Sequence, residues 1–226
     1  MATQLEIINL ALGHLAVATI TSTNEASVAA QAAVRVWDHA RKECLRGHDW
    51  SFGTVVATLT LSASYATLTT SGLYGGGYIY AYQYPSNCLA MWKIYNETND
   101  DKNISDGFRE LYDPANAARV IVSNTLDALC EYTFDVTDPQ FFDASFVKVL
   151  SYKLASELAM PLTGDKDLSE SMMKIFTALM SDAERMSALE NNPDELREGS
   201  SVFIKARGGS EDTLDHFDPN NTHPND

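Results

Sequence analysis

The residues of this chain that could carry out acid–base chemistry are its carboxylates, and they are numerous. Asp100-Asp101 and the Asp165/Asp167 pair lie in polar stretches that we expect to be loops, where a solvated surface charge is the ordinary outcome. Serine nucleophiles lack the Gly-x-Ser-x-Gly elbow that exposes them in many hydrolases. The residues therefore predict no catalytic site and no enzyme.

A run of three glycines, Gly75-Gly76-Gly77, is the nearest approach to a phosphate-binding loop. It has neither the Gly-Lys-Ser/Thr ending of such a loop nor a helix after it, so it does not predict nucleotide binding. Tyr74 and Tyr78 flank the glycines, which favours a loop tip that offers contact surface. No two histidines share a predicted helix at i,i+4 spacing, so we expect neither a metal nor a cofactor.

Alternating tyrosines follow this loop. Tyr78, Tyr80, Tyr82 and Tyr84 are predicted to lie on one face of a strand, because side chains alternate with a period of two. Such a face could stack on sugars or bases. Packing against a helix or a neighbouring subunit is the simpler interpretation.

Charge limits the partners that the protein can have. The 226 residues include 16 Lys and Arg against 31 Asp and Glu, a formal net charge of −15. This balance argues against non-specific binding to phosphate backbones or anionic lipid, which requires basic patches. It is compatible with a position beside DNA, since an acidic wall repels the duplex and stops it from adhering.

The cysteines and the N-terminus indicate a reduced, soluble protein made in the cytosol. Cys44, Cys88 and Cys130 are odd in number and have no Cys-x-x-Cys spacing, so we expect buried thiols and no disulfide. The N-terminus has no basic segment typical of a signal peptide. No apolar run reaches the roughly 18 residues of a membrane span, so no membrane contact is expected.

Helices are predicted at both ends of the chain. Thr3 and Glu6 form a capping box before apolar residues that follow at helical spacing to about His14. Asp138-Pro139 is an N-cap followed by proline at the first helical position, and Pro161 ends that helix. The last predicted helix, 167–191, faces inward with Leu168, Met172, Ile175, Leu179, Ala183 and Met186.

The second predicted helix is built for close packing. It begins at Glu25, which forms a capping box with Ser22, and Gly47 is placed to end it. Its inward face consists of small residues and one indole: Ala26, Ala30, Ala33, Trp37, Ala40 and Cys44. Its outer face is predicted to carry Gln31, Arg35, Asp38, Arg41, Lys42 and Arg46. Such a small-residue face lets a second helix approach closely, with Trp37 as the one large side chain.

Together these patterns predict an α+β fold that is mainly α. Residues 1–49 and 138–192 form a four-helix bundle, and residues 50–137, where the period changes to two, form a small antiparallel β subdomain inserted into it. Residues 193–226 have the composition of a disordered tail, but they include the apolar Val202-Phe203-Ile204. We therefore expect an extended C-terminal arm that docks on a partner.

Several short blocks between about residues 4 and 190 resemble one known family in their order and spacing. They are Ala11-Leu12-Gly13, Ala40-Arg41-Lys42-Glu43-Cys44-Leu45, Trp50-Ser51-Phe52, Tyr80-Ala81-Tyr82-Gln83-Tyr84-Pro85-Ser86-Asn87-Cys88-Leu89, Asp138-Pro139 with Phe142 and Phe146, and Leu154-Ala155-Ser156-Glu157-Leu158-Ala159-Met160-Pro161-Leu162-Thr163. This pattern is similar to the tail tubular protein A family of short-tailed bacteriophages (podoviruses), the head-to-tail adaptors or connectors. Tyr84-Pro85 stands where the family has Leu-Pro, and Asn87 where it has an acid. Both replacements suit a turn.

The resemblance implies a structural virion protein. Family members form a homo-oligomeric ring, usually of twelve subunits, that docks under the portal protein and presents its lower face to the tail nozzle, which is tubular protein B-like. DNA passes through the ring during ejection without specific binding. The implied localisation is the tail or neck of the virion, after assembly in the host bacterial cytoplasm.

Interface residues are expected in two segments. By hypothesis, the first segment faces the nozzle or a neighbouring subunit, and it comprises Tyr74, Gly75, Gly76, Gly77 and Tyr78. The second anchors the C-terminal arm on the portal, through Val202, Phe203, Ile204 and Phe217.

Two other classes of protein remain open on the sequence. A virion-associated glycan hydrolase would need two carboxylates about 5–9.5 Å apart in a cleft. A soluble assembly chaperone or interaction module that forms no ring would be absent from the mature particle. Turnover of cell-wall or capsule polysaccharide would identify the first, and copy number in virions separates the adaptor from the second.

Overall fold

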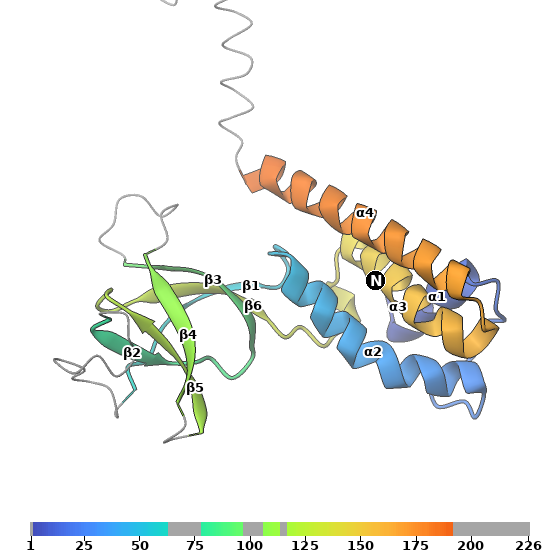
Figure 1. Cartoon of the computed structure of the whole chain (residues 1–226), viewed down its shortest axis with the longest axis horizontal. Coiled ribbons are helices and arrows are strands. Elements are labelled where there is room, and N and C mark those ends of the chain that lie inside the picture. The colour runs from blue at the N-terminus through green and yellow to red at the C-terminus, as the bar shows by residue number, and fades with distance from the viewer. Residues whose placement is uncertain (1, 63–77, 97–105, 114–116, 192–226) are drawn as a thin grey trace, which may run out of the picture. The chain divides into compact units, whose positions relative to one another are not determined.

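The computed structural model describes residues 2–62, 78–96, 106–113 and 117–191, with side chains as far as residue 186. The chain divides into two units, Met1–Glu184 and Arg185–Asp226, and the contacts discussed below lie within the first. In chain order the elements are α1 Gln4–His14, α2 Val28–Gly47, β1 Thr54–Thr58, β2 Tyr80–Gln83, β3 Cys88–Tyr95, β4 Phe108–Asp113, β5 Ala118–Ser123, β6 Leu129–Phe134, the 3₁₀ helix η1 Pro139–Phe141, α3 Ala144–Thr163 and α4 Lys166–Asn191 (Figure 1).

Helices and strands therefore both contribute to the described chain, as an α+β fold requires. The strands all lie between residues 54 and 134, and the helices lie on either side of that range. These bounds agree with the segments expected to form the helical and β parts. That the two parts are separate domains stays a prediction.

The first helix begins as its capping box predicts. Glu6 donates its backbone N–H to Thr3 Oγ1 at 3.2 Å, and Thr3 donates its own N–H to the Glu6 carboxylate at 2.8 Å. Asn9 then fixes the following loop, since its side chain donates to the carbonyl of Ile20 at 3.0 Å and accepts from the Ile20 N–H at 2.9 Å.

The start of α2 differs from the prediction, which placed a capping box at Ser22 and Glu25. Ser27 is the N-cap, and its hydroxyl accepts from the N–H of Ala30 at 3.2 Å. The Glu25 carboxylate instead accepts from the N–H of Thr21 at 3.0 Å. Residues 21–25 therefore form a hydrogen-bonded turn before the helix begins. Glu25 stabilises this turn and does not cap α2.

The small-residue face of α2 is largely as predicted. Its five buried members within the helix are Ala30, Ala33, Trp37, Ala40 and Cys44, whereas Ala26 is exposed and precedes the helix. Gly47 is the last residue of α2 but has an ordinary φ, so it is not a left-handed cap. A Cβ at Gly47 would lie 2.5 Å from Met180 Cε, which shows how closely α4 approaches there.

Arg41 was predicted on the outer face of α2, and this prediction is wrong, because its side chain is only 2% exposed. Its guanidinium donates to the carboxylate of Asp135 at 2.5 Å and to the carbonyl of Val136 at 2.6 Å. Arg41 follows Trp37 by four residues and so lies at the margin of the buried stripe. Its counter-charge comes from the segment after β6, which helical periodicity cannot reveal.

The strands form two antiparallel sheets of three, with the orders β1-β6-β3 and β2-β5-β4. The sequence predicted one sheet and gave no signal for β4. Backbone hydrogen bonds join the sheets, from Ser62 to Ala81 at 3.0 Å, from Gln83 to Thr60 at 2.8 Å and from Asp106 to the carbonyl of Ile94 at 2.7 Å. Both sheets therefore contribute to one core, with buried members Leu59, Tyr82, Cys88, Met91, Ile94, Ile121, Ala128, Cys130 and Tyr132.

The four tyrosines of residues 78–84 do not share one face, contrary to the prediction. Tyr82 is buried in the core of the two sheets, and Tyr80 and Tyr84 pack against it partly buried. Tyr78 lies outside β2 and packs instead on a second small cluster, on the side of Ala81. The alternation fails at Tyr78 because the regular strand begins only at residue 80.

The bounds of α3 correct two predictions. Asp138 caps the short η1 helix, and it is Asp143 that caps α3. Pro161 lies inside α3 and does not end it; the chain leaves the helix at Gly164, whose φ of 71° is left-handed. Pro161 has no N–H to donate, so α3 lacks one backbone hydrogen bond in its last turn.

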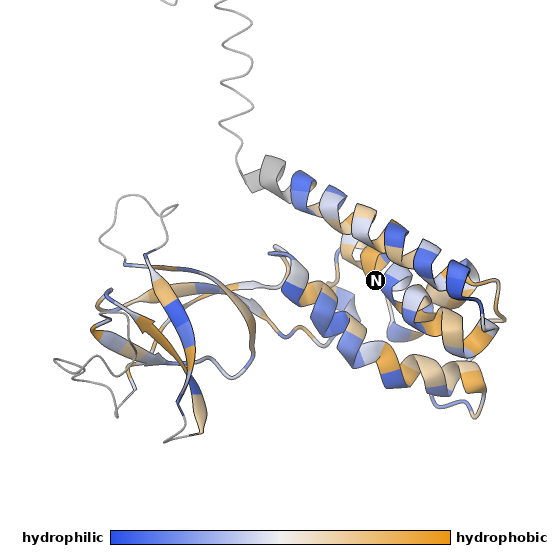
Figure 2. Ribbon diagram, in the orientation of Figure 1, coloured by the Kyte–Doolittle hydropathy of each residue, from blue (hydrophilic) through white to orange (hydrophobic). Residues whose placement is uncertain are grey.

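One face of α4 packs on the helical core, as predicted for Leu168, Met172, Leu179 and Ala183. Apolar and polar side chains alternate along this helix (Figure 2). Ile175 and Met186 were predicted to face inward but are exposed. Their places are taken by Phe176 and Met180.

An aromatic cluster connects the strands to the helices. Phe146 of α3 is fully buried, and its ring centroid lies 5.0 Å from that of Trp50, 5.1 Å from Phe52 and 4.7 Å from Phe142. The Trp50 indole also donates to the carbonyl of Cys44 at 3.0 Å. Edge-to-face rings at these separations add to the gain from burial.

A buried ion cluster ties α2 to α3. The ammonium of Lys153 is 2.8 Å from Glu43 and 3.1 Å from Glu157. Burial lowers the pKa of Lys153, but hydrogen bonds to both carboxylates outweigh burial and raise the pKa overall. Lys153 is therefore a charged structural group.

Candidate interaction surfaces

Of the nine residues predicted to form interfaces, Tyr78 lies in the described chain. It is half-buried and lines a hollow at the end of the strands. The other eight lie outside the described residues, and their role stays a prediction: Tyr74, Gly75, Gly76, Gly77, Val202, Phe203, Ile204 and Phe217.

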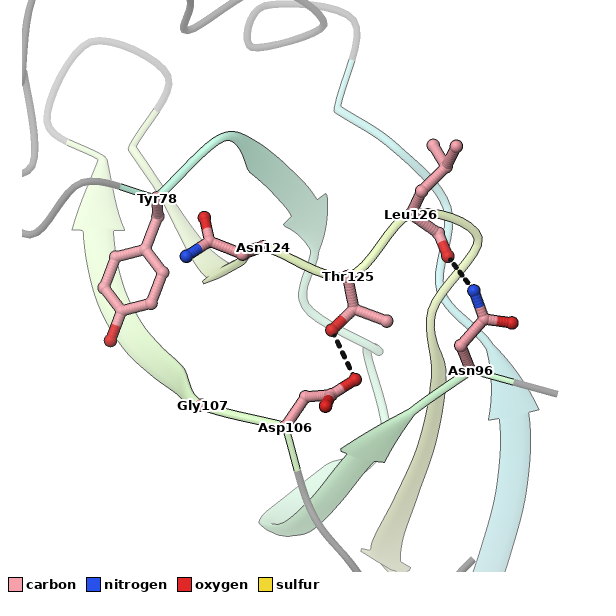
Figure 3. A pocket seen from close by; sticks show the side chains of 7 residues that line it. All are labelled: Tyr78, Asn96, Asp106, Gly107, Asn124, Thr125 and Leu126. Carbon is pink, nitrogen blue, oxygen red and sulfur yellow. Dashed lines mark hydrogen bonds between the residues drawn. The ribbon is translucent and has the colours of Figure 1, made fainter. Parts of the chain in front are cut away.

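The strand-end hollow has a volume of about 420 Å³ and is mostly polar. Its lining residues are Tyr78, Asn96, Asp106, Gly107, Asn124, Thr125 and Leu126. Figure 3 shows the hydroxyl of Thr125 directed at Asp106, a bond of 2.7 Å, and the amide of Asn96 directed at the carbonyl of Leu126, a bond of 3.0 Å. Asn124 accepts the N–H of Ile79 at 2.9 Å. These side chains mainly bond to one another and fix the turn after β5.

Of the seven described residues that line this hollow, Asp106 carries a carboxylate. Elsewhere, Asp49 lies close enough to Glu131 for its charge to raise the pKa of Glu131. They line neither hollow described in this section.

Glu131 gives a testable pH dependence. Its pKa is raised above the ordinary value, first by burial and further by the charge of Asp49, although Lys93 at 3.7 Å opposes this. The folded protein therefore binds this proton more tightly than the unfolded chain does. The resulting stability is complete below the unfolded pKa of about 4.5 and is lost as the pH rises through the raised pKa.

We expect Glu131→Gln to raise the melting temperature at pH 7, and the advantage to vanish below about pH 4.5, where wild-type Glu131 is itself protonated. Thermal unfolding across this pH range measures the effect. Glu170→Gln on the exposed face of α4 serves as the control. A variant that is equally stabilised at all pH values would contradict the assignment.

All three cysteines are buried and free, which confirms the prediction of buried thiols. Burial raises the pKa of Cys44 to about 12 and that of Cys130 to about 11, and it also raises the pKa of Cys88. Protonated, buried thiols are poor nucleophiles and poor metal ligands. Within the described ranges, no group of three His, Cys, Asp or Glu residues is placed to hold a metal ion.

A second hollow lies at the start of α2 and has a volume of about 540 Å³. We call it the helix-start hollow; its lining residues are Thr23, Asn24, Glu25, Ala26, Gln31, Val34 and Arg35. Val34 is 47% exposed, and the neighbouring Val28 is 72% exposed. Arg35 has no ion-pair partner in the part of the chain that the structure describes.

Phe141 is the most exposed large aromatic side chain of the described residues, at 66%. Phe141 was not among the predicted interface residues, and the family resemblance includes only its neighbour Phe142. The Phe141-Phe142 pair was the available signal, because consecutive side chains of extended backbone point to opposite sides. Phe142 is the one that packs inward.

The described surface is that of a mixed helical and sheet protein with exposed apolar side chains around two open hollows. None of its described helices has the length and apolar run that crossing a membrane requires. No model of a known protein family matches the chain, and no curated protein matches it.

Proposed function

We propose that this protein is a structural virion protein, the head-to-tail adaptor of a short-tailed bacteriophage. Twelve copies form a ring between the portal protein and the tail nozzle, and the ring lines the channel through which DNA leaves the head. The protein is not an enzyme and needs no cofactor. It is assembled in the bacterial cytoplasm and resides in the neck of the virion.

The observation that carries this proposal is that the blocks resembling the adaptor family meet in the fold, although they are far apart in the chain. Trp50 and Phe146, from two different blocks, are in edge-to-face contact at 5.0 Å. Lys153 joins Glu43 of the second block to Glu157 of the last. These contacts support the proposal because blocks that are distant in the chain pack as parts of one structure.

In this proposal the four helices form a bundle that makes the ring wall. The core of α1, α2 and α3 is extended by partly buried side chains of α4, such as Leu168 and Phe176. Residues 50–137 are the inserted β subdomain. Residues 193–226, which lie outside the described residues, form the arm that reaches the portal.

The acidic charge supports a channel-lining role. With a net charge of −15 per copy, a ring of twelve would carry a strongly negative field, which repels the duplex where acidic side chains line the channel. DNA could then pass without stopping. Specific binding to DNA is not part of the proposal.

Native mass spectrometry of the protein alone, and mixed with the portal ring of its own phage, tests the proposal. A stoichiometric ring of adaptor on the portal is the expected result. The adaptor function would be contradicted if the protein failed to bind the portal. It would also be contradicted if the protein were absent from purified virions, where about twelve copies are expected. A protein that assists assembly and is absent from the particle would then be an assembly chaperone.

Deleting residues 199–226 should weaken docking on the portal without unfolding the rest of the chain. The deletion removes the four predicted arm contacts, Val202, Phe203, Ile204 and Phe217, which lie outside the described residues. Removing only residues 218–226 keeps all four contacts and is the matched control. Portal-complex yield and circular dichroism are measured together, and an unchanged yield after the longer deletion would exclude the arm from docking.

A further inference from the structure

The side chain of Phe141 is exposed on a turn whose backbone is restrained. Pro139 restricts the backbone at the start of η1, and the Asp138 carboxylate accepts the N–H of Gln140 at 3.0 Å. The next ring, Phe142, is fixed at 4.7 Å from Phe146. A large aromatic side chain displayed on a rigid turn loses little entropy on binding, which is the property of interface hot spots.

The helix-start hollow is likewise preformed. The Glu25 carboxylate is turned into its own loop, where it accepts the N–H of Thr21 at 3.0 Å and the Thr21 hydroxyl at 3.1 Å. This leaves the exposed Val34 and Ala26 as apolar lining, and it leaves Arg35 as a positive charge that forms no ion pair with any other residue that the structure describes. Its volume of about 540 Å³ is within the about 300–1,000 Å³ typical of binding pockets, so an aromatic ring and its turn have room.

Charge indicates what enters this hollow. Two copies that each carry a net charge of −15 repel one another, so a contact between copies needs opposite charges where they meet. Phe141 lies between the exposed carboxylates of Asp138 and Asp143, and the hollow presents Arg35. The hollow is lined by one base, Arg35, and one acid, Glu25, whose carboxylate is hydrogen-bonded to Thr21, so Arg35 is the group of the hollow that can pair with the acidic aromatic turn.

We propose that Phe141 of one copy inserts into the helix-start hollow of the next copy, with Asp138 and Asp143 beside Arg35. The inference rests on the proposed ring, and it names the contact that builds it. Turn and hollow are different surface sites, so each copy can use its turn on one neighbour and its hollow on the other, which makes the proposed contact head-to-tail. Such a contact repeats from copy to copy and closes into a ring when the rotation allows.

Mixing two variants that each carry one introduced cysteine, Val34→Cys and Gln140→Cys, tests the contact directly, because the exposed Gln140 adjoins Phe141 and its replacement leaves the Phe141 ring in place. The three native cysteines are buried with raised pKa values, so the introduced thiols are the reactive ones. A thiol cross-linker should join the two variants in a yield several-fold above that of Leu10→Cys mixed with Gln140→Cys. Leu10 on α1 is the matched control, because it is 48% exposed against 47% for Val34.

Phe141→Ala should weaken self-association by roughly 30-fold, the equivalent of a hot spot of about 2 kcal/mol. Tyr112→Ala, which removes another exposed aromatic, should leave it unchanged. Equal cross-linking of both pairs, unchanged association of the Phe141 variant, or a reciprocal twofold dimer would each overturn the proposal.

The outcome also separates this inference from the proposed function. If Phe141→Ala still forms a full ring on the portal, the contact is wrong and the adaptor function stands. If the specific cross-link forms but the protein never binds the portal, the contact is right and the adaptor function falls.

Discussion

Asp135→Ala is expected to lower the free energy of unfolding by about 3–5 kcal/mol, because it leaves the buried guanidinium of Arg41 without its counter-charge. Arg41 is 2% exposed and donates to Asp135 at 2.5 Å, and its Nε has no hydrogen-bond partner, so no remaining group can take over fully. Val136 would still accept one bond through its carbonyl. Urea unfolding followed by circular dichroism measures the loss as a lower midpoint.

Asp38→Ala is the matched control for this experiment. Asp38 also faces Arg41, at 3.6 Å, but its side chain is 80% exposed. Exposed ion pairs contribute about 0–1 kcal/mol, so the midpoint should hardly move. Equal effects of the two substitutions would mean that Asp135 is not the counter-charge that allows Arg41 to be buried.

Phe146→Ala is expected to cost a further 3–5 kcal/mol or so, the typical result of removing a buried aromatic side chain. Phe146 is fully buried and contacts the rings of Trp50, Phe52 and Phe142, so its loss opens a cavity where strands and helices meet. The fluorescence of Trp50 should change with the same transition. The measurement is the free energy of unfolding in urea.

Phe141→Ala supplies the comparison, since it deletes the same side chain five residues away. With its ring 66% exposed, its truncation should change the free energy of unfolding by less than about 0.5 kcal/mol. The same variant is expected to weaken self-association. A phenylalanine that matters for contact and not for stability is what an assembly surface requires, and a large loss of stability here would contradict that role.

These two sites show why the blocks of sequence that resemble the adaptor family need not mark a binding surface. Arg41, Trp50 and Phe146 all belong to such blocks, yet they hold the helices and the strands together. Exposed apolar side chains occur inside these blocks, as at Met160, and also at residues that are not members of them, such as Phe141 and Val34. Contact surfaces therefore have to be found from exposure and charge.

Features that depend on near neighbours in the chain could be predicted from the residues alone. The capping box of Thr3 and Glu6, the small-residue face of α2 and the burial of the cysteines were all predicted, because periodicity and local hydrogen bonding govern them. The mixed class of helices and strands was predicted for the same reason. The predicted capping box of Ser22 and Glu25 was wrong, because the Glu25 carboxylate bonds to Thr21 within the loop.

Features that join distant segments became visible only in the tertiary structure. Arg41 is buried because Asp135, 94 residues later, brings its carboxylate to it. Tyr78 departs from the face of Tyr82 because β2 must pair with β5, and that pairing begins at residue 80. The helix-start hollow and the exposure of Phe141 likewise depend on the folded conformation of a loop and a turn. Packing and electrostatic pairing act through space, so the spacing of residues along the chain does not show which distant residue a given side chain will contact.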